Sequence, residues 1–333
     1  MKRTWRFCGV FAFAMFVMTG MSFGAEKITW KMQGSHPSGD GATQRWLKYA
    51  DEIAKRTNGQ MDLQVHYSSG LGFAPGDALN VVSRGLLPAN ELTISYLEGQ
   101  EPWFKYGTLP FASKSYDEAR IQRETAYPYL ERYVWAKWKV VPLVQWIWDP
   151  MVIFSTKRID TLEDIKGLKV RVFGTSLPKL MMAVGATPVT MPFGEVPVAL
   201  RLGTVDAAVT SYTLAVSAKL YEAVKYVYAT NIFFGSDGWL VANQAAFEKL
   251  PNNVRDEMSR TAKEFNENQW ASAIEAMKIA QDTFRGRGVS IVNPPKDLMS
   301  KMEEAAKPIW AEWTDSVEGS KSYLDEYLSK LNR

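Results

Sequence analysis

Short β-branched runs alternate with stretches of helical spacing along residues 161–212. The predicted order is strand (168–173), helix (176–184), strand (187–191), helix (195–203) and strand (205–210). Strands that alternate with helices of about ten residues predict right-handed βαβ crossovers and a parallel sheet. A ligand is then expected beyond the carboxyl ends of these strands.

The same alternation extends along the rest of the chain. The helix predicted at about 253–285 would be roughly 50 Å long at 1.5 Å per residue, so it is expected to span two domains. The other predicted elements are strands at 28–33, 61–67, 91–97, 140–148, 151–155, 225–228, 233–242 and 289–292, and helices at 41–56, up to 84, at 115–137 and twice after 295.

An acidic residue and a proline, Asp149-Pro150, interrupt the apolar run between 140 and 155. Because proline cannot donate to a sheet ladder, this break is the candidate crossover between domains. A chain of 333 residues can bury two substantial cores, and the predicted class is α/β with two domains. The first is predicted to comprise 26–149 with about 240–270, and the second 150–239 with about 271–333, the helix at 253–285 spanning both.

Residues 1–25 have the organisation of a secretory signal peptide. Three basic residues lead into an apolar run at 7–18, and small residues follow up to Ala25. The apolar run is too short for a comfortable membrane span, so cleavage near Ala25 or Glu26 is expected. An uncleaved anchor is the alternative.

Charge and cysteine content exclude several classes of function. The chain carries 39 Lys and Arg against 36 Asp and Glu, and three of the bases lie in the predicted signal peptide. The remainder is near neutral, which argues against a nucleic-acid partner. The only cysteine, Cys8, lies in the same segment, so no disulfide or thiol chemistry is expected after cleavage. With only His36 and His66, zinc-site spacings are missing, and no cofactor is expected.

A secreted enzyme is the alternative class. Ser176 and Lys179 have the Ser-x-x-Lys spacing of penicillin-recognising acyltransferases, but the accompanying Ser-Asp-Asn and Lys-Thr-Gly elements are absent. The chain contains no Gly-x-Ser-x-Gly sequence, and Gly70-Leu-Gly72 lacks the third glycine of a dinucleotide-binding loop. We therefore expect a protein that is not an enzyme.

Arg171 is a single charge set between two valines of a predicted strand. A guanidinium is always charged, and its planar fork pairs with a carboxylate through two hydrogen bonds. Two interpretations follow. Arg171 pairs with an internal Asp or Glu, or it binds an anionic ligand at the strand end.

Four spaced sequence blocks carry a family resemblance. They are Leu162-Glu-Asp-Ile-Lys-Gly-Leu-Lys-Val-Arg-Val172, Gly185-Ala-Thr-Pro188, Met191-Pro-Phe-Gly-Glu-Val196 and Gly203-Thr-Val-Asp206. In this order and spacing the chain resembles the extracytoplasmic solute-binding proteins of tripartite ATP-independent periplasmic (TRAP) transporters, of the DctP type. Four blocks in order are far more specific than one short motif.

The resemblance implies a periplasmic-binding-protein-like fold whose two α/β domains, joined by hinge strands, close over an organic acid. It implies residence in the periplasm and delivery of the ligand to a sodium-coupled TRAP permease, with Arg171 in a salt bridge to the ligand carboxylate. A monomer is the default for such proteins, and a dimer through the terminal helices is the alternative. A binding protein of an ABC transporter or of a sensor is the other interpretation of the same two-domain pattern.

Departures from the family pattern bear on the ligand. Thr210 stands where many relatives have an asparagine that hydrogen-bonds the acid, and the apolar stretch 151–153 stands where many have a second arginine. A dicarboxylate clamped by two arginines is therefore disfavoured. We hypothesise a monoanionic ligand, a carboxylate or sulfonate, with an apolar or aromatic remainder.

Aromatic and polar side chains near predicted strand ends complete the candidate site. Each aromatic residue has core packing as its alternative role, and His36 could instead cap a turn. The aromatic candidates are Trp148, Phe173, Phe193, Tyr212, Phe234 and Trp239, and the first domain is expected to add Gln33 and His36 from its first strand and Tyr96 from the end of its third.

Overall fold

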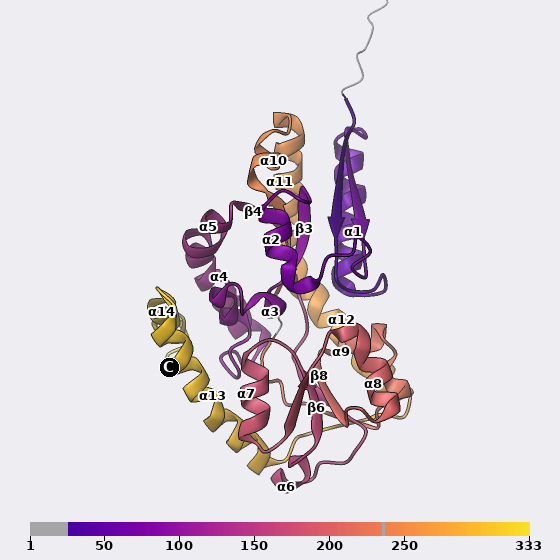
Figure 1. Ribbon diagram of the computed structural model, residues 1–333, viewed down its shortest axis with the longest axis vertical. Coiled ribbons are helices and arrows are strands. Elements are labelled where there is room, and N and C mark those ends of the chain that lie inside the picture. Colours follow the sequence, from indigo (N-terminus) through magenta and orange to yellow (C-terminus); the bar gives the residue numbers. More distant parts are fainter. Residues whose placement is uncertain (1–25, 235–236) are drawn as a thin grey trace, which may run out of the picture.

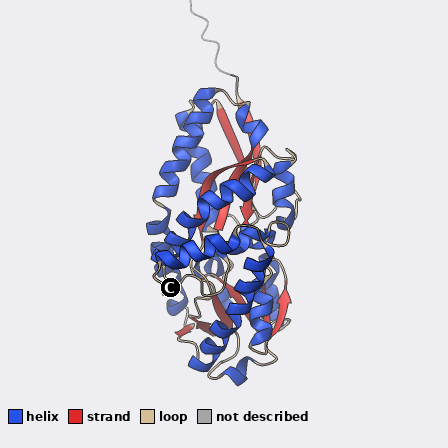
Figure 2. Ribbon diagram, turned by 90° about the vertical axis from the view of Figure 1, so that its left-hand side faces the viewer, coloured by secondary structure: helices blue, strands red, loops and turns tan. Residues whose placement is uncertain are grey.

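The computed structural model describes residues 26–234 and 237–333, and the predicted signal peptide at 1–25 lies outside them. Two α/β lobes stack along the long axis of the molecule (Figures 1 and 2). We call the part built on β1–β4 and β10 the first lobe, and the part built on the six-stranded sheet the second lobe. The crossing segment, residues 148–151, joins β4 of the first lobe to β5 of the second.

The first lobe contains two small sheets. Strands β1 (Ile28–Gln33) and β2 (Met61–His66) pair in parallel, and β3 (Ala89–Thr93), β10 (Asp237–Asn243) and β4 (Val140–Ile147) form an antiparallel sheet in the order β3-β10-β4. Helix α1 (Gly41–Arg56) connects β1 to β2 and begins where the Asp40 side chain accepts the N–H of Ala42. Its apolar face is buried, so this helix forms part of the core of the first lobe.

The second lobe has one sheet in the order β11-β9-β5-β8-β6-β7. Its strands are β5 (Val152–Ser155), β6 (Lys169–Val172), β7 (Thr187–Thr190), β8 (Ala207–Thr210), β9 (Tyr226–Tyr228) and β11 (Ser290–Val292). Strand β6 lies between β7 and β8 and is parallel to both, as the pattern at 161–212 predicted. Strand β5 is antiparallel to β8 and β9, so the complete sheet is mixed.

Helices cover both lobes, and the C-terminal pair contacts both of them. Helix α13 (Lys296–Ser316) packs on α7, and α14 (Ser320–Lys330) packs on α4 of the first lobe, so the division of domains made from sequence stays a prediction.

Among residues 26–234 and 237–333, no helix combines the length and hydropathy needed to cross a bilayer. The remaining helices are α2 (Ala78–Ser83), α3 (Ile94–Leu97), α4 (Tyr116–Leu130), α5 (Ala136–Trp138), α6 (Leu162–Ile165), α7 (Ser176–Ala183), α8 (Val196–Leu202), α9 (Tyr212–Ser217) and α10 (Gln244–Glu248).

The strand predicted at 91–97 is shorter than expected. It ends at Thr93, and the chain continues as helix α3, so Tyr96 lies on a helical turn and not at a strand end. Thr93 is the last residue of β3 that pairs with β10, opposite Gly238. The residues after it are held by helix α3 instead of a sheet ladder.

Helix covers nearly all of the predicted 253–285, but the prediction that it is one continuous helix is wrong. The structure has two helices, α11 (Asn252–Glu267) and α12 (Gln269–Gly286), which meet at Asn268. The Arg45 guanidinium donates to the carbonyl of Phe265, the group that a continuous helix would offer to the N–H four residues later. A side chain that enters the helical ladder in this way explains the break.

Asn266, beside this break, fastens the helix to the edge of β4. Its Nδ2 donates to the carbonyl of Leu143 at 2.9 Å, and its Oδ1 accepts the N–H of Gln145 at 2.8 Å. We expect Asn266→Ala to lower the free energy of unfolding by about 2 kcal/mol, because two backbone groups lose their partners. Urea unfolding measures this loss.

Asn253→Ala is the matched control, since Asn253 lies on the same helix but makes an exposed hydrogen bond to Gln60. A change below about 0.5 kcal/mol is expected there. Equal losses in the two variants would show that the contact with β4 does not stabilise the helix.

Candidate functional site

A small cavity of about 20 Å³ lies where the two lobes and the crossing segment meet. It has room for about one water, far less than the roughly 300 Å³ of a small-molecule pocket, so a ligand would enter only when the lobes separate. It is lined by His36, Thr93, Ser95 and Tyr96 of the first lobe, Trp148 and Met151 of the crossing segment, and Arg171, Phe173, Thr210 and Leu214 of the second lobe.

Arg171 is the buried charge of this cavity, with 1% of its surface exposed. Its Nε and Nη2 donate to the carbonyl of Met191 at 3.1 and 2.9 Å, and its Nη1 donates to that of Val209 at 3.2 Å. Burial lowers the pKa of Arg171, and a hydrogen bond with Tyr96 partly offsets this effect. Within residues 26–234 and 237–333, no carboxylate oxygen lies within 4.0 Å of the guanidinium, so the internal ion pair considered from sequence does not form.

Two aromatic rings flank the same guanidinium. Its central carbon lies 5.0 Å from the ring centroid of Phe173 and 5.7 Å from that of Phe193. Cation–π contacts favour a guanidinium, but they leave its positive charge uncompensated. An anion that enters the cavity would therefore meet a cation already held in place.

A second polar group faces the cavity from the first lobe. His36 Nδ1 lies 2.9 Å from Glu91 Oε1, and both side chains are buried. Burial alone would lower the pKa of His36, but the charge and hydrogen bond of Glu91 outweigh it and raise the pKa. The pKa of Glu91 is lowered, because His36 and the donors Thr93 and Trp46 outweigh the cost of its burial. His36 and Glu91 therefore form a hydrogen-bonded pair within the first lobe.

The crossing segment touches both lobes. The indole of Trp148 lies against His36, with ring centroids 4.8 Å apart, and its Nε1 is 3.5 Å from Asp40 Oδ1. The buried carboxylate of Asp149 accepts the N–H of Tyr212 at 2.6 Å and the hydroxyl of Thr213, so it caps helix α9 of the second lobe. Burial raises the pKa of Asp149 to about 6.

The structure brings six of the eleven predicted site residues to the cavity. Phe193 lies beside them at its mouth, while Gln33 holds the loop at 70–76 through the backbone of Leu71 and Phe73. The six residues are His36, Tyr96, Trp148, Arg171, Phe173 and Thr210.

The other three aromatic candidates lie elsewhere. Tyr212 packs against Phe154 and Phe284, and the ring of Phe234 packs against Tyr116. Trp239 lines a different groove. None of the three lines the cavity between the lobes.

Sequence reasoning missed Thr93 and Ser95, which line the cavity, and Glu91, which orients His36. For Glu91 and Thr93 the available signal was their spacing of two residues, which places both side chains on one face of an extended strand. Ser95 lies on helix α3, so this spacing does not account for its position. Met151 and Leu214 carry no comparable signal, because an apolar residue near a strand end is usually part of the core.

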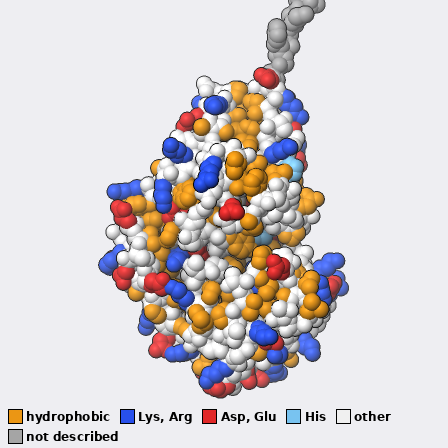
Figure 3. Space-filling view, viewed as in Figure 1, with side chains coloured by type: hydrophobic (Ala, Val, Ile, Leu, Met, Phe, Trp, Pro, Cys, Tyr) orange, Lys and Arg blue, Asp and Glu red, His pale blue; other side chains and the backbone are white. Residues whose placement is uncertain are grey.

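Two larger openings share Tyr96 with the cavity. One, of about 460 Å³, lies between His36 and Phe193, and the other, of about 450 Å³, lies between Ser95 and Gly174. Figure 3 shows apolar side chains exposed on both lobes near their junction. Tyr96 therefore lines the cavity and both openings, and Arg171 lines the cavity alone.

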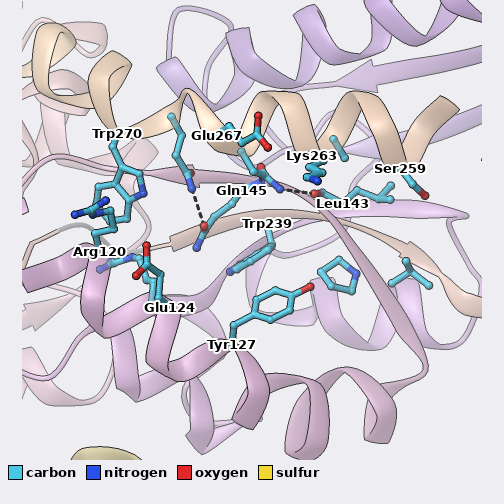
Figure 4. A pocket seen from close by; sticks show the side chains of 16 residues that line it. Arg120, Glu124, Tyr127, Leu143, Gln145, Trp239, Ser259, Lys263, Glu267 and Trp270 are labelled. Carbon is cyan, nitrogen blue, oxygen red and sulfur yellow. Dashed lines mark hydrogen bonds between the residues drawn. The ribbon is translucent and has the colours of Figure 1, made fainter. Parts of the chain in front are cut away.

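A separate groove of about 630 Å³ lies on the first lobe between α4, β4 and the break of α11 and α12. In Figure 4, Tyr127 and Trp239 lie on one side, and Lys263 and Glu267 lie on the other. Both signs of charge frame it, and the sheet of the second lobe contributes nothing to its lining. In the described part of the chain, no group of three or more His, Cys, Asp or Glu side chains is placed to hold a metal ion.

Comparison with known proteins gives one family. Residues 32–316 match the bacterial extracellular solute-binding proteins, family 7 (DctP). A solute-binding protein of Albidiferax ferrireducens is 25% identical over 299 residues, which cover 87% of each chain.

Solved structures agree with this match. DctP7, a Bordetella pertussis extracytoplasmic solute receptor binding pyroglutamic acid, superposes with a TM-score of 0.85 at 25% identity, over 90% of this chain and 99% of that one. A TRAP periplasmic solute-binding protein of Chromohalobacter salexigens with bound D-glucuronate has the same fold, with a TM-score of 0.80 at 22% identity over 90% and 98% of the two chains.

Asp149→Asn tests the cost of burying the carboxylate that caps α9. The pKa of Asp149 is raised from 3.8 to about 6, so its contribution to stability is present below about pH 4 and is lost as the pH rises through about 6. Relative to the variant, the wild-type protein should lose up to about 3 kcal/mol of unfolding free energy between about pH 4 and pH 7. Urea unfolding of both proteins across this range measures it. A pH-independent difference between them would contradict the raised pKa.

Proposed function

The chain belongs to the bacterial extracellular solute-binding proteins, family 7, and from this premise we propose that it captures a small organic anion between its lobes for a TRAP permease. The observation that carries the proposal is the buried guanidinium of Arg171, held by two main-chain carbonyls at the meeting point of the lobes. Burial of a charge costs several kcal/mol unless an opposite charge compensates it. A carboxylate of the ligand would supply that charge in a bidentate pair.

The ligand is a monoanion with a compact remainder. The cavity contains one cation without a carboxylate partner, Arg171, since His36 is already paired with Glu91. Phe173 and Trp148 offer apolar surface, while Thr93, Ser95 and Thr210 offer hydroxyl groups. Pyroglutamic acid combines one carboxylate with a small ring, and it is the ligand named for the Bordetella pertussis receptor, so it is the first compound to test.

Capture proceeds by closure of the lobes. The anion reaches Arg171 in the open cleft, and the first lobe then contacts its other side through Tyr96 and His36. A ligand that touches both lobes binds the closed arrangement more tightly than the open one, so it shifts the equilibrium toward closure. The signal peptide at 1–25 directs the protein to the periplasm, where the sodium-coupled permease receives the ligand from the closed form.

Calorimetry against a panel of acids tests the ligand class. Pyroglutamate and other compact monocarboxylates should bind more tightly than succinate or malate, because a second carboxylate would be desolvated without a second arginine. Mass spectrometry of denatured protein should first establish that no acid has co-purified. Tighter binding of a dicarboxylate would refute the monoanion assignment.

Arg171→Ala should weaken binding of the best monoanion by roughly 100- to 5,000-fold, since loss of a buried ion-pair partner costs about 3–5 kcal/mol. Arg171→Lys should also weaken it by at least about tenfold, because an ammonium lacks the planar fork. Arg158→Ala is the control, since Arg158 is an exposed arginine of the second lobe. Calorimetry measures all three variants. Wild-type affinity in the lysine variant would refute the bidentate pair.

A further inference from the structure

Glu91 is a buried carboxylate of the first lobe on which several polar groups converge. It lies on β3, and only 3% of its surface is exposed. Its Oε2 accepts the backbone N–H of Ser35 and the indole N–H of Trp46, both at 3.2 Å. Its Oε1 accepts the hydroxyl of Thr93 at 2.9 Å and lies 2.9 Å from His36 Nδ1. One side chain therefore orients groups from three separate segments of the lobe.

The carboxylate decides which ring nitrogen of His36 carries a hydrogen. Although burial opposes the change, the contacts with His36, Thr93 and Trp46 lower the pKa of Glu91, so the group is ionised at neutral pH. An ionised carboxylate only accepts hydrogen bonds, so Nδ1 carries a hydrogen in the neutral and in the charged imidazole. The other nitrogen, Nε2, then offers a lone pair when the ring is neutral and a hydrogen when it is charged.

His36 faces the place assigned to the ligand. It lines the cavity from the first lobe, and Arg171 lines it from the second. The imidazole lies against Trp148, with ring centroids 4.8 Å apart, and its Nδ1 is turned to Glu91. Nε2 is therefore the polar atom of the ring that is left to meet an anion bound at Arg171.

We propose that Glu91 is a positioning residue, and that through it His36 Nε2 recognises a second, uncharged polar group of the ligand. The ligand class is a monocarboxylate that carries such a group. Charged His36 donates to an acceptor oxygen of the ligand, whereas neutral His36 accepts from a hydroxyl or an N–H. The inference rests on the proposed function, since the carboxylate of the ligand is assigned to Arg171.

Charged groups from several elements act on His36. Burial lowers its pKa and Arg171 of β6 adds to this effect, but Glu91 of β3 and Asp40, which precedes α1, outweigh both. The phenol of Tyr96 on α3 lines the same cavity. The pKa of His36 is thus raised above its ordinary value of 6.5. Affinity for an acid with an acceptor oxygen should therefore fall as the pH rises through this pKa.

NMR of protein with isotope-labelled histidine tests the orientation without any ligand. The chain has two histidines, so His66→Gln assigns both sets of ring signals. Spectra that correlate ring nitrogens with ring protons show which nitrogen carries a hydrogen. Wild-type His36 should keep the hydrogen on Nδ1 at every pH and lose the one on Nε2 as it titrates. A neutral His36 with its hydrogen on Nε2 would overturn the proposal.

Glu91→Gln should reverse the contact with little change of shape. The N–H groups of Ser35 and Trp46 can only donate, so they hold the amide oxygen at the position of Oε2. The amide NH₂ then faces His36 and donates to Nδ1, which moves the hydrogen of the neutral imidazole to Nε2. The pKa of His36 should also fall, because the carboxylate that raises it is gone. Glu101→Gln is the control, since Glu101 is similarly buried in the first lobe and does not line the cavity.

Two acids that differ in one ring atom test the recognition by calorimetry. Tetrahydrofuroate has an acceptor oxygen next to the carbon that bears the carboxylate, and cyclopentanecarboxylate has a methylene there. The ratio of their affinities should favour tetrahydrofuroate at least about tenfold more where His36 is charged than where it is neutral, because the oxygen then gains a hydrogen bond from a charged group. In Glu91→Gln the neutral imidazole donates from Nε2, so most of this pH dependence should disappear. Glu101→Gln should keep it.

Three results would overturn the proposal: an affinity ratio that is independent of pH, a Glu91→Gln variant that keeps the wild-type tautomer, or a His36 that does not titrate between about pH 5 and pH 9. If Glu91→Gln does not fold, the wild-type spectra and the wild-type affinity ratio decide. Failure of both acids and of pyroglutamate to bind would contradict the proposed function and the recognition that rests on it. The spectra would still decide whether Glu91 fixes the hydrogen of His36.

Discussion

The buried guanidinium of Arg171 is the constraint from which the arrangement of the site follows. Strand β6 lies between β7 and β8 and runs parallel to both, so the three strands deliver their carboxyl ends to one edge. The carbonyls of Met191 and Val209, near the ends of β7 and β8, are therefore within reach of a side chain that leaves β6. Right-handed crossovers through α7 and α8 make this the natural order. The cation is positioned by topology before any ligand arrives.

Sequence reasoning predicted the second lobe better than the first. The strands and helices at 161–212 depend on local patterns, which the structure confirms, and Arg171 stood out as a charge in an apolar strand. The incorrect predictions concern features that depend on residues far away in the sequence. Strand β3 has its last partner at Gly238 of β10, almost 150 residues later, and the long helix breaks because Arg45 reaches it from α1. Trp239 was misplaced because a tryptophan within a strand gives no signal of which face of the sheet it occupies.

The crossing segment is attached more strongly to the second lobe than to the first. Asp149 is bound to the start of α9, so the crossing segment is attached firmly to the second lobe. On the other side, the indole of Trp148 approaches Asp40 at only 3.5 Å and fits against Gly238, where a Cβ would lie 2.9 Å from the ring. Rotation of the lobes is thus expected to take place on the first-lobe side of this segment, where the contacts are fewer and weaker.

The two openings that share Tyr96 with the cavity bear on the fate of solvent during closure. A cleft with one mouth would have to expel its water past the incoming ligand. Here two openings share lining residues with the cavity, so water that leaves it has two adjoining spaces to enter. If the lobes close on the proposed anion, less solvent would then be trapped between the guanidinium and the carboxylate it receives.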